Sequence, residues 1–258
     1  MAVSPHLDDA VFSVGGTLER LGADTLVVTC FTGSTDPATV TPFGLSTQLD
    51  KGLSADVDYM ALRREEDRRA LAVLGVTGRH LDLLEAPHRG YDSPAELFAG
   101  RHDDDAVAGP LADALGPLLA DADLVLAPQA LGDHVDHQWV GAVVADLVDP
   151  GRVAWWRDTP YVLRRPDAAP MEHVAGQELA VDVTAELDRK VAAVRCYVTQ
   201  VPFQFGTAEA AGPALTGLAR DEAARSGAAA PVEVLRAGVR AAEVLAPLGG
   251  KRDREPSR

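Results

Sequence analysis

The sequence contains few cysteines, no long apolar run and little positive charge. Only Cys30 and Cys196 occur among 258 residues, so the chain has neither a disulfide framework nor a cysteine-based zinc site. No stretch of about 18 apolar residues is present to form a transmembrane helix. Residues 1–6 lack the charged and apolar parts of a secretory signal peptide. We therefore expect a cytoplasmic protein with reduced thiols.

The scarcity of positive charge limits the kinds of partner. Lys and Arg number 24 against 39 Asp and Glu, which gives a formal net charge of -15 and a pI near 4.8. A surface of this sign repels phosphate backbones and anionic membranes. We expect a small-molecule substrate and no nucleic-acid or membrane partner, and the sequence leaves open whether the chain forms a homo-oligomer.

The chain does contain a regular alternation of apolar strands and amphipathic helices. Hydrophobic residues make up 47% of it, which is sufficient for a sizeable core. Apolar runs typical of buried strands occur at 25–31, 81–84, 124–127 and 153–156. Helical periodicity covers 11–21, 59–74, 106–119, 139–147 and 187–197. This alternation predicts an α/β, Rossmann-like fold with a mostly parallel sheet, helices on both faces and a ligand site at the carboxyl ends of the strands.

Some segments do not follow the alternation. Residues 32–57 and 86–105 are rich in Gly, Pro, Ser, Thr or Asp and lack periodicity. Irregular segments of that length in a compact domain are usually functional, for example as lids. Residues 232–245 are compatible with a helix. There is no internal repeat and no clear domain boundary.

Chemically active side chains gather in two clusters, each directly after a predicted strand. The first is Pro5-His6-Leu7-Asp8-Asp9 and the second is His134-Val135-Asp136-His137. Both clusters belong to the sheet edge where α/β proteins bind ligands. Imidazoles and carboxylates that converge from separate loops match a catalytic zinc site, which has three protein ligands and an open position for water.

Each cluster alone has an ordinary structural explanation. Asp8 and Asp9 would cap a helix and complement its dipole, and His134 and His137 would be loop histidines. Capping does not explain both clusters together, so the pair favours a metal-dependent site.

The two clusters and the glycine pair Gly15-Gly16 resemble the signature of the LmbE-like, or PIG-L, family of zinc-dependent N-acetylglucosamine deacetylases. Lys190, followed by Tyr197-x-x-Gln200, is similar to a further family pattern. The resemblance implies a deacetylase domain over residues 1–205. Residues 206–258 then form an Ala- and Gly-rich extension that packs on or trails the same domain.

A more specific similarity exists within the family. Residues 4–13, the segment Leu62-Arg63-Arg64-Glu65-Glu66-Asp67 and the pattern Trp156-x-Asp158-x-Pro160-Tyr161 are similar to deacetylases of glycopeptide-antibiotic biosynthesis in actinomycetes. The Ala- and Arg-rich, Lys-poor composition suits such a source.

The resemblance implies a role for each residue of the two clusters. One zinc ion per chain is bound by His6, Asp9 and His137. Asp8 is the general base that takes a proton from the attacking water and later delivers it to the leaving amine. His134 donates to the amide oxygen, and Asp136 keeps that imidazole protonated and oriented. Other divalent metals suit the same ligands.

Candidate substrate contacts lie outside the two clusters. Glu85 stands where relatives carry an acid that holds the sugar, and Arg63 matches an arginine that contacts substrate in some relatives. A solvated loop acid and an ion-paired helix arginine are the alternatives. His88, Arg89 and Tyr91 follow in the second irregular segment and are expected to line the mouth of the pocket.

The sequence thus predicts a zinc-dependent amidohydrolase that removes an N-acyl group, most simply acetyl, from a 2-amino sugar in a glycoside or natural-product intermediate. Two alternatives remain. One is the same mechanism on a different N-acyl amide, such as a thiol-conjugate precursor. The other is a catalytically silent relative that binds metal or carbohydrate.

Overall fold

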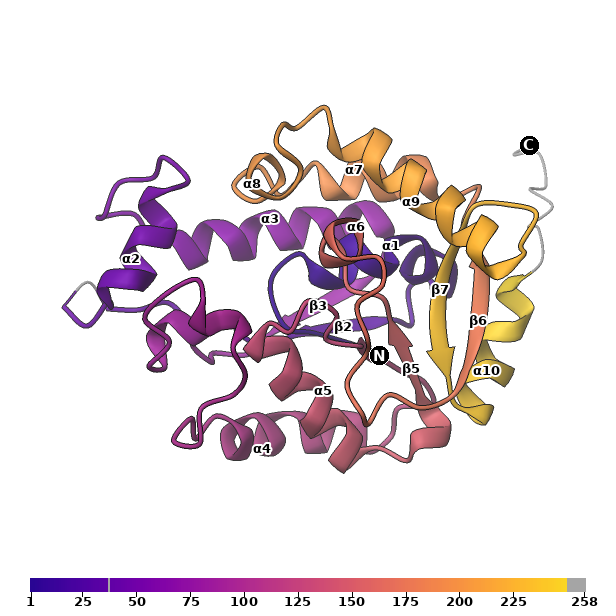
Figure 1. The fold of residues 1–258 in the computed structure, drawn as a ribbon, viewed down its shortest axis with the longest axis horizontal. Helices are drawn as coiled ribbons and strands as arrows, with labels where there is room; N and C mark the ends of the chain where they lie inside the picture. Colours follow the sequence, from indigo (N-terminus) through magenta and orange to yellow (C-terminus); the bar gives the residue numbers. More distant parts are fainter. Residues whose placement is uncertain (37, 250–258) are drawn as a thin grey trace.

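A seven-stranded sheet lies at the centre of the computed structural model, which describes residues 1–36 and 38–249 (Figure 1). The strand order is β3-β2-β1-β4-β5-β7-β6. The strands are β1 Ala2–Ser4, β2 Leu26–Thr29, β3 Thr77–His80, β4 Val125–Pro128, β5 Val153–Trp156, β6 Gln177–Asp182 and β7 Val232–Ala237. Strands β1 to β5 run parallel, whereas β7 is antiparallel to β5 and β6. The prediction of a mostly parallel α/β sheet is confirmed.

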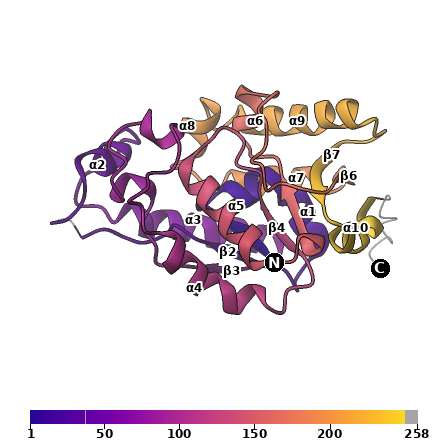
Figure 2. The same cartoon turned by 60° about the horizontal axis from the view of Figure 1, so that its bottom comes forward.

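Helices cover both faces of this sheet. The α-helices are α1 Asp9–Leu21, α2 Pro42–Leu49, α3 Tyr59–Leu74, α4 Ala108–Leu119, α5 Val135–Leu147, α6 Tyr161–Arg164, α7 Leu187–Val194, α8 Val201–Phe205, α9 Ala211–Ser226 and α10 Val239–Leu245. Short 3-10 helices are η1 Ala86–His88, η2 Glu96–Phe98, η3 Pro150–Arg152 and η4 Ala246–Gly249. Helices α1, α3 and α7 pack on one face, and α4 and α5 pack on the other (Figures 1 and 2).

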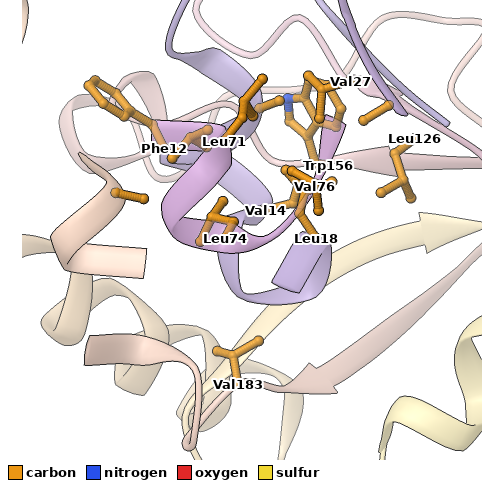
Figure 3. Packing of buried hydrophobic residues seen from close by; sticks show 14 of the residues in the cluster. Phe12, Val14, Leu18, Val27, Leu71, Leu74, Val76, Leu126, Trp156 and Val183 are labelled. Atoms are coloured by element: carbon orange, nitrogen blue, oxygen red, sulfur yellow. The ribbon is translucent and has the colours of Figure 1, made fainter. Parts of the chain in front are cut away.

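The strands divide their side chains between two hydrophobic clusters. Because successive strand residues point to opposite faces, Ala2 belongs to the cluster under α1, α3 and α7, whereas Val3 belongs to the cluster under α4 and α5. Trp156 belongs to the first cluster and is surrounded by aliphatic side chains of the sheet and helices (Figure 3). Trp155 belongs to the second. The two faces are thus buried separately, as an α/β layer architecture requires.

Two segments differ from the predicted secondary structure. Strand β3 lies at 77–80 instead of 81–84, because it is an exposed edge strand without an apolar pattern, and the buried Leu81 follows it. Residues 232–237 form strand β7 and not a helix, because this segment pairs with both β5 and β6. Only 239–245 is helical there. Strand propensity and pairing override the weak helical signal.

The irregular segment 32–57 and the extension 206–258 both contain regular structure. Helix α2 forms within the first because Thr41 caps it through its side-chain oxygen and Pro42 occupies the first turn. The extension supplies α9, β7 and α10, and its residues beyond 249 lie outside the described part. Within the described residues, no helix is both long and apolar enough to span a membrane.

Candidate metal centre and active site

The first cluster is fixed by the centre of the sheet. Strand β1 has only three residues, but all are buried, and it lies between β2 and β4. The Ser4 hydroxyl donates to the His6 carbonyl oxygen at 2.8 Å and accepts the Ala10 N–H at 3.1 Å. The His6 N–H in turn donates to Asp9 Oδ2 at 2.8 Å. A short strand and one tight turn therefore hold His6 and Asp9 in a defined arrangement.

His6, Asp9 and His137 bring their ligand atoms together. His6 Nδ1 lies 3.1 Å from Asp9 Oδ2, and His137 Nε2 lies 3.2 Å from the same oxygen. The three possible ligand atoms lie within 4.8 Å of one another. His137 comes from the start of α5, so two segments far apart in sequence meet at the carboxyl edge of the parallel strands.

A carboxylate on the far side of each imidazole orients its ring. His6 Nε2 lies 2.9 Å from Asp136 Oδ2, and His137 Nδ1 lies 2.7 Å from Asp158 Oδ1. Imidazoles that bind metals usually have such a partner, which fixes the ring and its tautomer. His137 Nε2 is buried and is not satisfied by a well-aligned hydrogen bond. A divalent cation bound here would give this nitrogen the partner that it lacks, so these three residues fit a metal ion.

Electrostatics at this point also favour a cation. Burial alone would lower the pKa of His137, but Asp9 and Asp158 raise it to about 9. The pKa of His6 is likewise raised, because Asp136 and Asp9 outweigh burial. The surrounding carboxylates thus stabilise positive charge here, whether protons or a metal ion supply it.

A second grouping, His6 with His134 and Asp136, also lies within 4.8 Å. It suits a metal less well because Asp136 is already occupied. Its carboxylate accepts from Arg89 at 2.7 Å and from the Ala86 N–H at 3.1 Å, besides contacting His6. Arg89, together with that bonding, holds the pKa of Asp136 well below its usual range although the residue is buried.

Asp8 stands beside the candidate metal ligands without belonging to either grouping. It is 6% exposed, and its Oδ1 lies 3.8 Å from the guanidinium of Arg63. Burial and the adjacent carboxylate of Asp9 raise the pKa of Asp8 to about 7, against the opposing charge of Arg63. Such a pKa suits a group that exchanges protons near neutral pH.

The structure corrects the expected pairing of His134 with Asp136. The Asp136 carboxylate does not keep the His134 ring protonated and oriented, because it contacts His6 and Arg89 instead. The Asp136 N–H donates to His134 Nδ1 at 3.2 Å, so His134 caps helix α5. Burial and the nearby charge of His6 lower the pKa of His134 to about 3. His134 is therefore neutral, and because Nδ1 accepts a hydrogen bond, Nε2 carries the proton.

The expected substrate contacts divide into two groups. Arg63 and Glu85 line a cavity of about 250 Å³ together with Asp8, and the two side chains form an ion pair. Arg89 does not line this cavity; it holds Asp136 and Asp105. Arg63 is thus ion-paired and also borders the cavity, so its contact with substrate stays a prediction.

Tyr91 does not line the mouth of the cavity, contrary to the expectation from the sequence. It is fully buried and donates its hydroxyl to Asp105. His88 is half-buried and borders an adjoining cavity of about 170 Å³ beneath α2, which shares Glu85 with the first cavity. The His88 ring lies so close to Gly44 that a Cβ there would be 2.1 Å from it.

The 250 Å³ cavity has two distinct parts. We call its buried and half-buried ionisable residues the floor: His6, Asp8, Asp9, Arg63, Glu85, His134 and Asp136. We call its outer residues the mouth: Phe43, Lys51, Phe98, Tyr161 and Phe203. Phe98 and Phe203 are 43% and 60% exposed. The Phe98 ring packs edge-on against His134, with centroids 5.3 Å apart. The mouth thus begins directly above the reactive groups.

Asp158 and the mouth residues were not identified as site residues from the sequence. Asp158 follows β5 just as the two clusters follow β1 and β4, and this position after a parallel strand is the signal that could have found it. The aromatic residues of the mouth come from α2, η2, α6 and α8. Tyr161 belongs to the pattern Trp156-x-Asp158-x-Pro160-Tyr161, but no sequence pattern joins the other three segments to it.

A mostly parallel α/β sheet that carries a candidate His/Asp metal grouping and a buried carboxylate at its carboxyl edge is suited to hydrolytic chemistry. The family described as PIG-L: GlcNAc-PI de-N-acetylase matches residues 1–148. The chain is 32% identical over 213 residues to the 2'-N-acetylparomamine deacetylase of Streptomyces fradiae, covering 78% of this chain and 72% of that protein. The chain therefore belongs to the PIG-L family of de-N-acetylases.

Solved structures give the same assignment. A zinc-inhibited form of teicoplanin deacetylase superposes with a TM-score of 0.77 at 28% identity, covering 91% of this chain and 96% of that one. The A40926 pseudoaglycone deacetylase superposes with a TM-score of 0.75 at 28% identity, covering 92% and 95%. The expected similarity to actinomycete antibiotic deacetylases is confirmed, as is the expected N-deacetylase class.

Proposed function

We propose that this enzyme removes the acetyl group from the nitrogen of a 2-amino sugar that is part of a larger natural product, and that it uses zinc. The observation that carries the proposal is the buried His137 Nε2, which has no well-aligned hydrogen bond and lies beside Asp9 and His6, with Asp8 on the cavity floor. The deacetylases of paromamine, teicoplanin and A40926 derivatives support the substrate class.

In this proposal His6, Asp9 and His137 hold the zinc ion. A divalent cation at such a site supplies Lewis-acid polarisation of the amide carbonyl and lowers the pKa of water. Asp136 and Asp158 hold the two imidazoles in the orientation that leaves His6 Nδ1 and His137 Nε2 facing Asp9. Asp136 thus acts through His6, and not through His134 as the sequence suggested.

Asp8 and His134 carry the proton and charge movements. Asp8, buried on the cavity floor beside Arg63, accepts a proton as water attacks the amide carbon and returns it to the departing amine. His134 Nε2–H donates to the carbonyl oxygen as negative charge develops there. A neutral imidazole serves this role because its other nitrogen is held by the Asp136 N–H.

The mouth supports a substrate that extends beyond one sugar. Exposed aromatic side chains and the ammonium of Lys51, 4.6 Å from the Phe203 ring centroid, border the route out of the cavity. An aromatic group attached to the sugar would stack there. Arg63 and Glu85 line the same cavity as an ion pair, and in this proposal they contact sugar hydroxyls.

The test is release of acetate and free amine by metal-stripped and zinc-reconstituted protein assayed side by side. The panel contains an aryl and a methyl N-acetylglucosaminide and an N-acetylated aminoglycoside. We expect zinc-dependent release with the aryl glycoside preferred. Release from an N-acetyl thiol conjugate but from no sugar would favour the alternative amide substrate. Stoichiometric zinc without release from any compound would favour the silent binder.

A further inference from the structure

Helix α1, which begins at the candidate metal ligand Asp9, is interrupted after its first turn. Val14 has a non-helical backbone, with φ -129° and ψ 26°, between two helical segments. An interruption of this kind leaves backbone N–H and C=O groups without their usual helical partners. The residues around it are buried, so these polar groups need partners from elsewhere in the protein.

Lys190 of α7 and Glu233 of β7 supply those partners. Lys190 Nζ donates to the Ser13 carbonyl oxygen at 3.1 Å and to Glu233 Oε1 at 2.7 Å. Glu233 accepts the N–H groups of Gly16 and Thr17 at 2.9 and 2.7 Å, and the Thr17 hydroxyl at 2.6 Å. One buried ion pair therefore caps both halves of the interrupted helix.

The glycine pair of the first motif allows this close approach. A Cβ at Gly15 would lie 3.0 Å from Lys190 Cγ, and a Cβ at Gly16 would lie 2.7 Å from Val183 Cγ1. The second contact is shorter than real Cβ contacts, so a side chain at Gly16 would push α1 away from Val183, the residue that follows β6. The glycines and Lys190, which the proposed chemistry leaves unexplained, thus belong to one structural arrangement.

The interruption is also connected to the opposite side of the candidate metal centre. Ser13 Oγ accepts the Thr159 N–H at 3.0 Å. Thr159 directly follows Asp158, whose carboxylate orients His137. Ser13 therefore lies between Asp9, one helical turn earlier in α1, and the residue that orients His137.

We propose that the Lys190–Glu233 ion pair is a positioning device for the metal centre: by capping the interrupted helix at Ser13, Gly16 and Thr17, it sets where Asp9 and Asp158 lie. This inference rests on the proposed metal-binding role of His6, Asp9 and His137. Neither Lys190 nor Glu233 lines the cavity floor or mouth. Both act through the helix and through Ser13.

The competing explanation is that the pair only stabilises the fold. A buried ion pair is by itself weak support for a stabilising role, because desolvation offsets the attraction between the charges. Removing one partner leaves the other charge buried and destabilises any protein. Stability alone therefore does not separate the two explanations, whereas the affinity and geometry of the metal site do.

The chain offers a closely matched control in Glu66. It is 4% exposed and accepts the N–H and the hydroxyl of Thr199 at 2.9 and 2.8 Å. Glu66 therefore accepts hydrogen bonds from a backbone N–H and a threonine hydroxyl in the segment before α8, as Glu233 does in α1. Glu66→Gln removes the same charge and disturbs a comparable cap outside the cavity floor and mouth.

The experiment compares full-length parent, Glu233→Gln and Glu66→Gln. Zinc affinity is measured by competition with a chelator, site geometry by the visible absorption of the cobalt-substituted proteins, and stability by thermal unfolding. We expect both variants to unfold at lower temperature. Only Glu233→Gln should weaken zinc binding, by about tenfold, the lower end of the range for groups that orient metal ligands, and change the cobalt spectrum.

A milder variant keeps the inference testable where Glu233→Gln does not fold. Ser13→Ala removes only the acceptor of the Thr159 N–H and leaves the ion pair intact. It should weaken zinc binding in the same direction and by a smaller factor. Parent-like zinc affinity and an unchanged cobalt spectrum in both the Glu233 and Ser13 variants would overturn this inference alone. A parent protein that binds no zinc would overturn the proposed function and this inference with it.

Discussion

The floor and the mouth of the cavity are built in opposite ways. On the floor, most groups have a partner that fixes them: Asp136 holds His6, the Asp136 N–H holds His134, and Arg63 pairs with Glu85. At the mouth, Phe203 and Phe98 expose about half of their surface. The floor residues follow or pack against central parallel strands, whereas the mouth residues come from short helices outside the sheet.

This difference separates reaction from recognition. Charged groups fixed in a dry environment stabilise charge development without reorganising, which an amide hydrolysis needs whatever the rest of the substrate is. Exposed aromatic side chains on short helices adapt to the shape of what they contact. Floor variants should therefore impair turnover of all substrates, and mouth variants should alter the preference among them.

The largest effect is expected for Asp8→Asn. The amide cannot accept the proton of the attacking water, so turnover should fall about 10²- to 10⁴-fold for every substrate, with zinc content unchanged. Steady-state kinetics and metal analysis measure the two quantities. Asp221→Asn, an exposed position on α9, serves as the matched control and should match the parent. Turnover within tenfold of the parent, with zinc bound, would remove Asp8 from the mechanism.

A smaller effect is expected for Asp158→Asn, which lies behind the floor and orients the candidate metal ligand His137. The new amide would donate to His137 Nδ1 and leave the proton on Nε2, the nitrogen that faces Asp9. Zinc affinity should fall about 10- to 100-fold, measured by chelator competition. Asp149→Asn is the control because Asp149 also accepts a backbone N–H, that of Gly151, but lies on the surface. Equal zinc affinities for the two variants would contradict the orienting role of Asp158.

Most of the floor was predictable from the sequence, because its residues stand in two short clusters of imidazoles and carboxylates that resemble a family signature. The direction in which the Asp136 carboxylate points was not predictable from the sequence. Asp136 and His134 are two residues apart at the start of a helix, where such neighbours do not face each other, and only the structure shows that Asp136 reaches His6 instead. The sequence predicts a helix where strand β7 carries Glu233, because the strands that pair with β7 are distant in sequence.

The mouth was not predictable, because its residues form no local pattern. Phe43, Phe98 and Phe203 stand about 50 and 100 residues apart and meet only through the fold. The loop residue Tyr91, by contrast, looked like a mouth residue in the sequence but is buried. Composition alone does not tell which aromatic side chain of an irregular segment turns inward.

The smallest effect is expected for Phe203→Ala. An aryl group that stacks on this partly exposed ring loses about 1 kcal/mol of contact, which corresponds to a KM increase of about 3- to 10-fold. The KM for the methyl glycoside should change less, and kcat should stay within about twofold for both, because the floor is untouched. Val239→Ala, a more exposed apolar position on α10, controls for surface change. An equal KM increase for both glycosides, or a fall in kcat, would show that the mouth takes part in the reaction and does not only select the substrate.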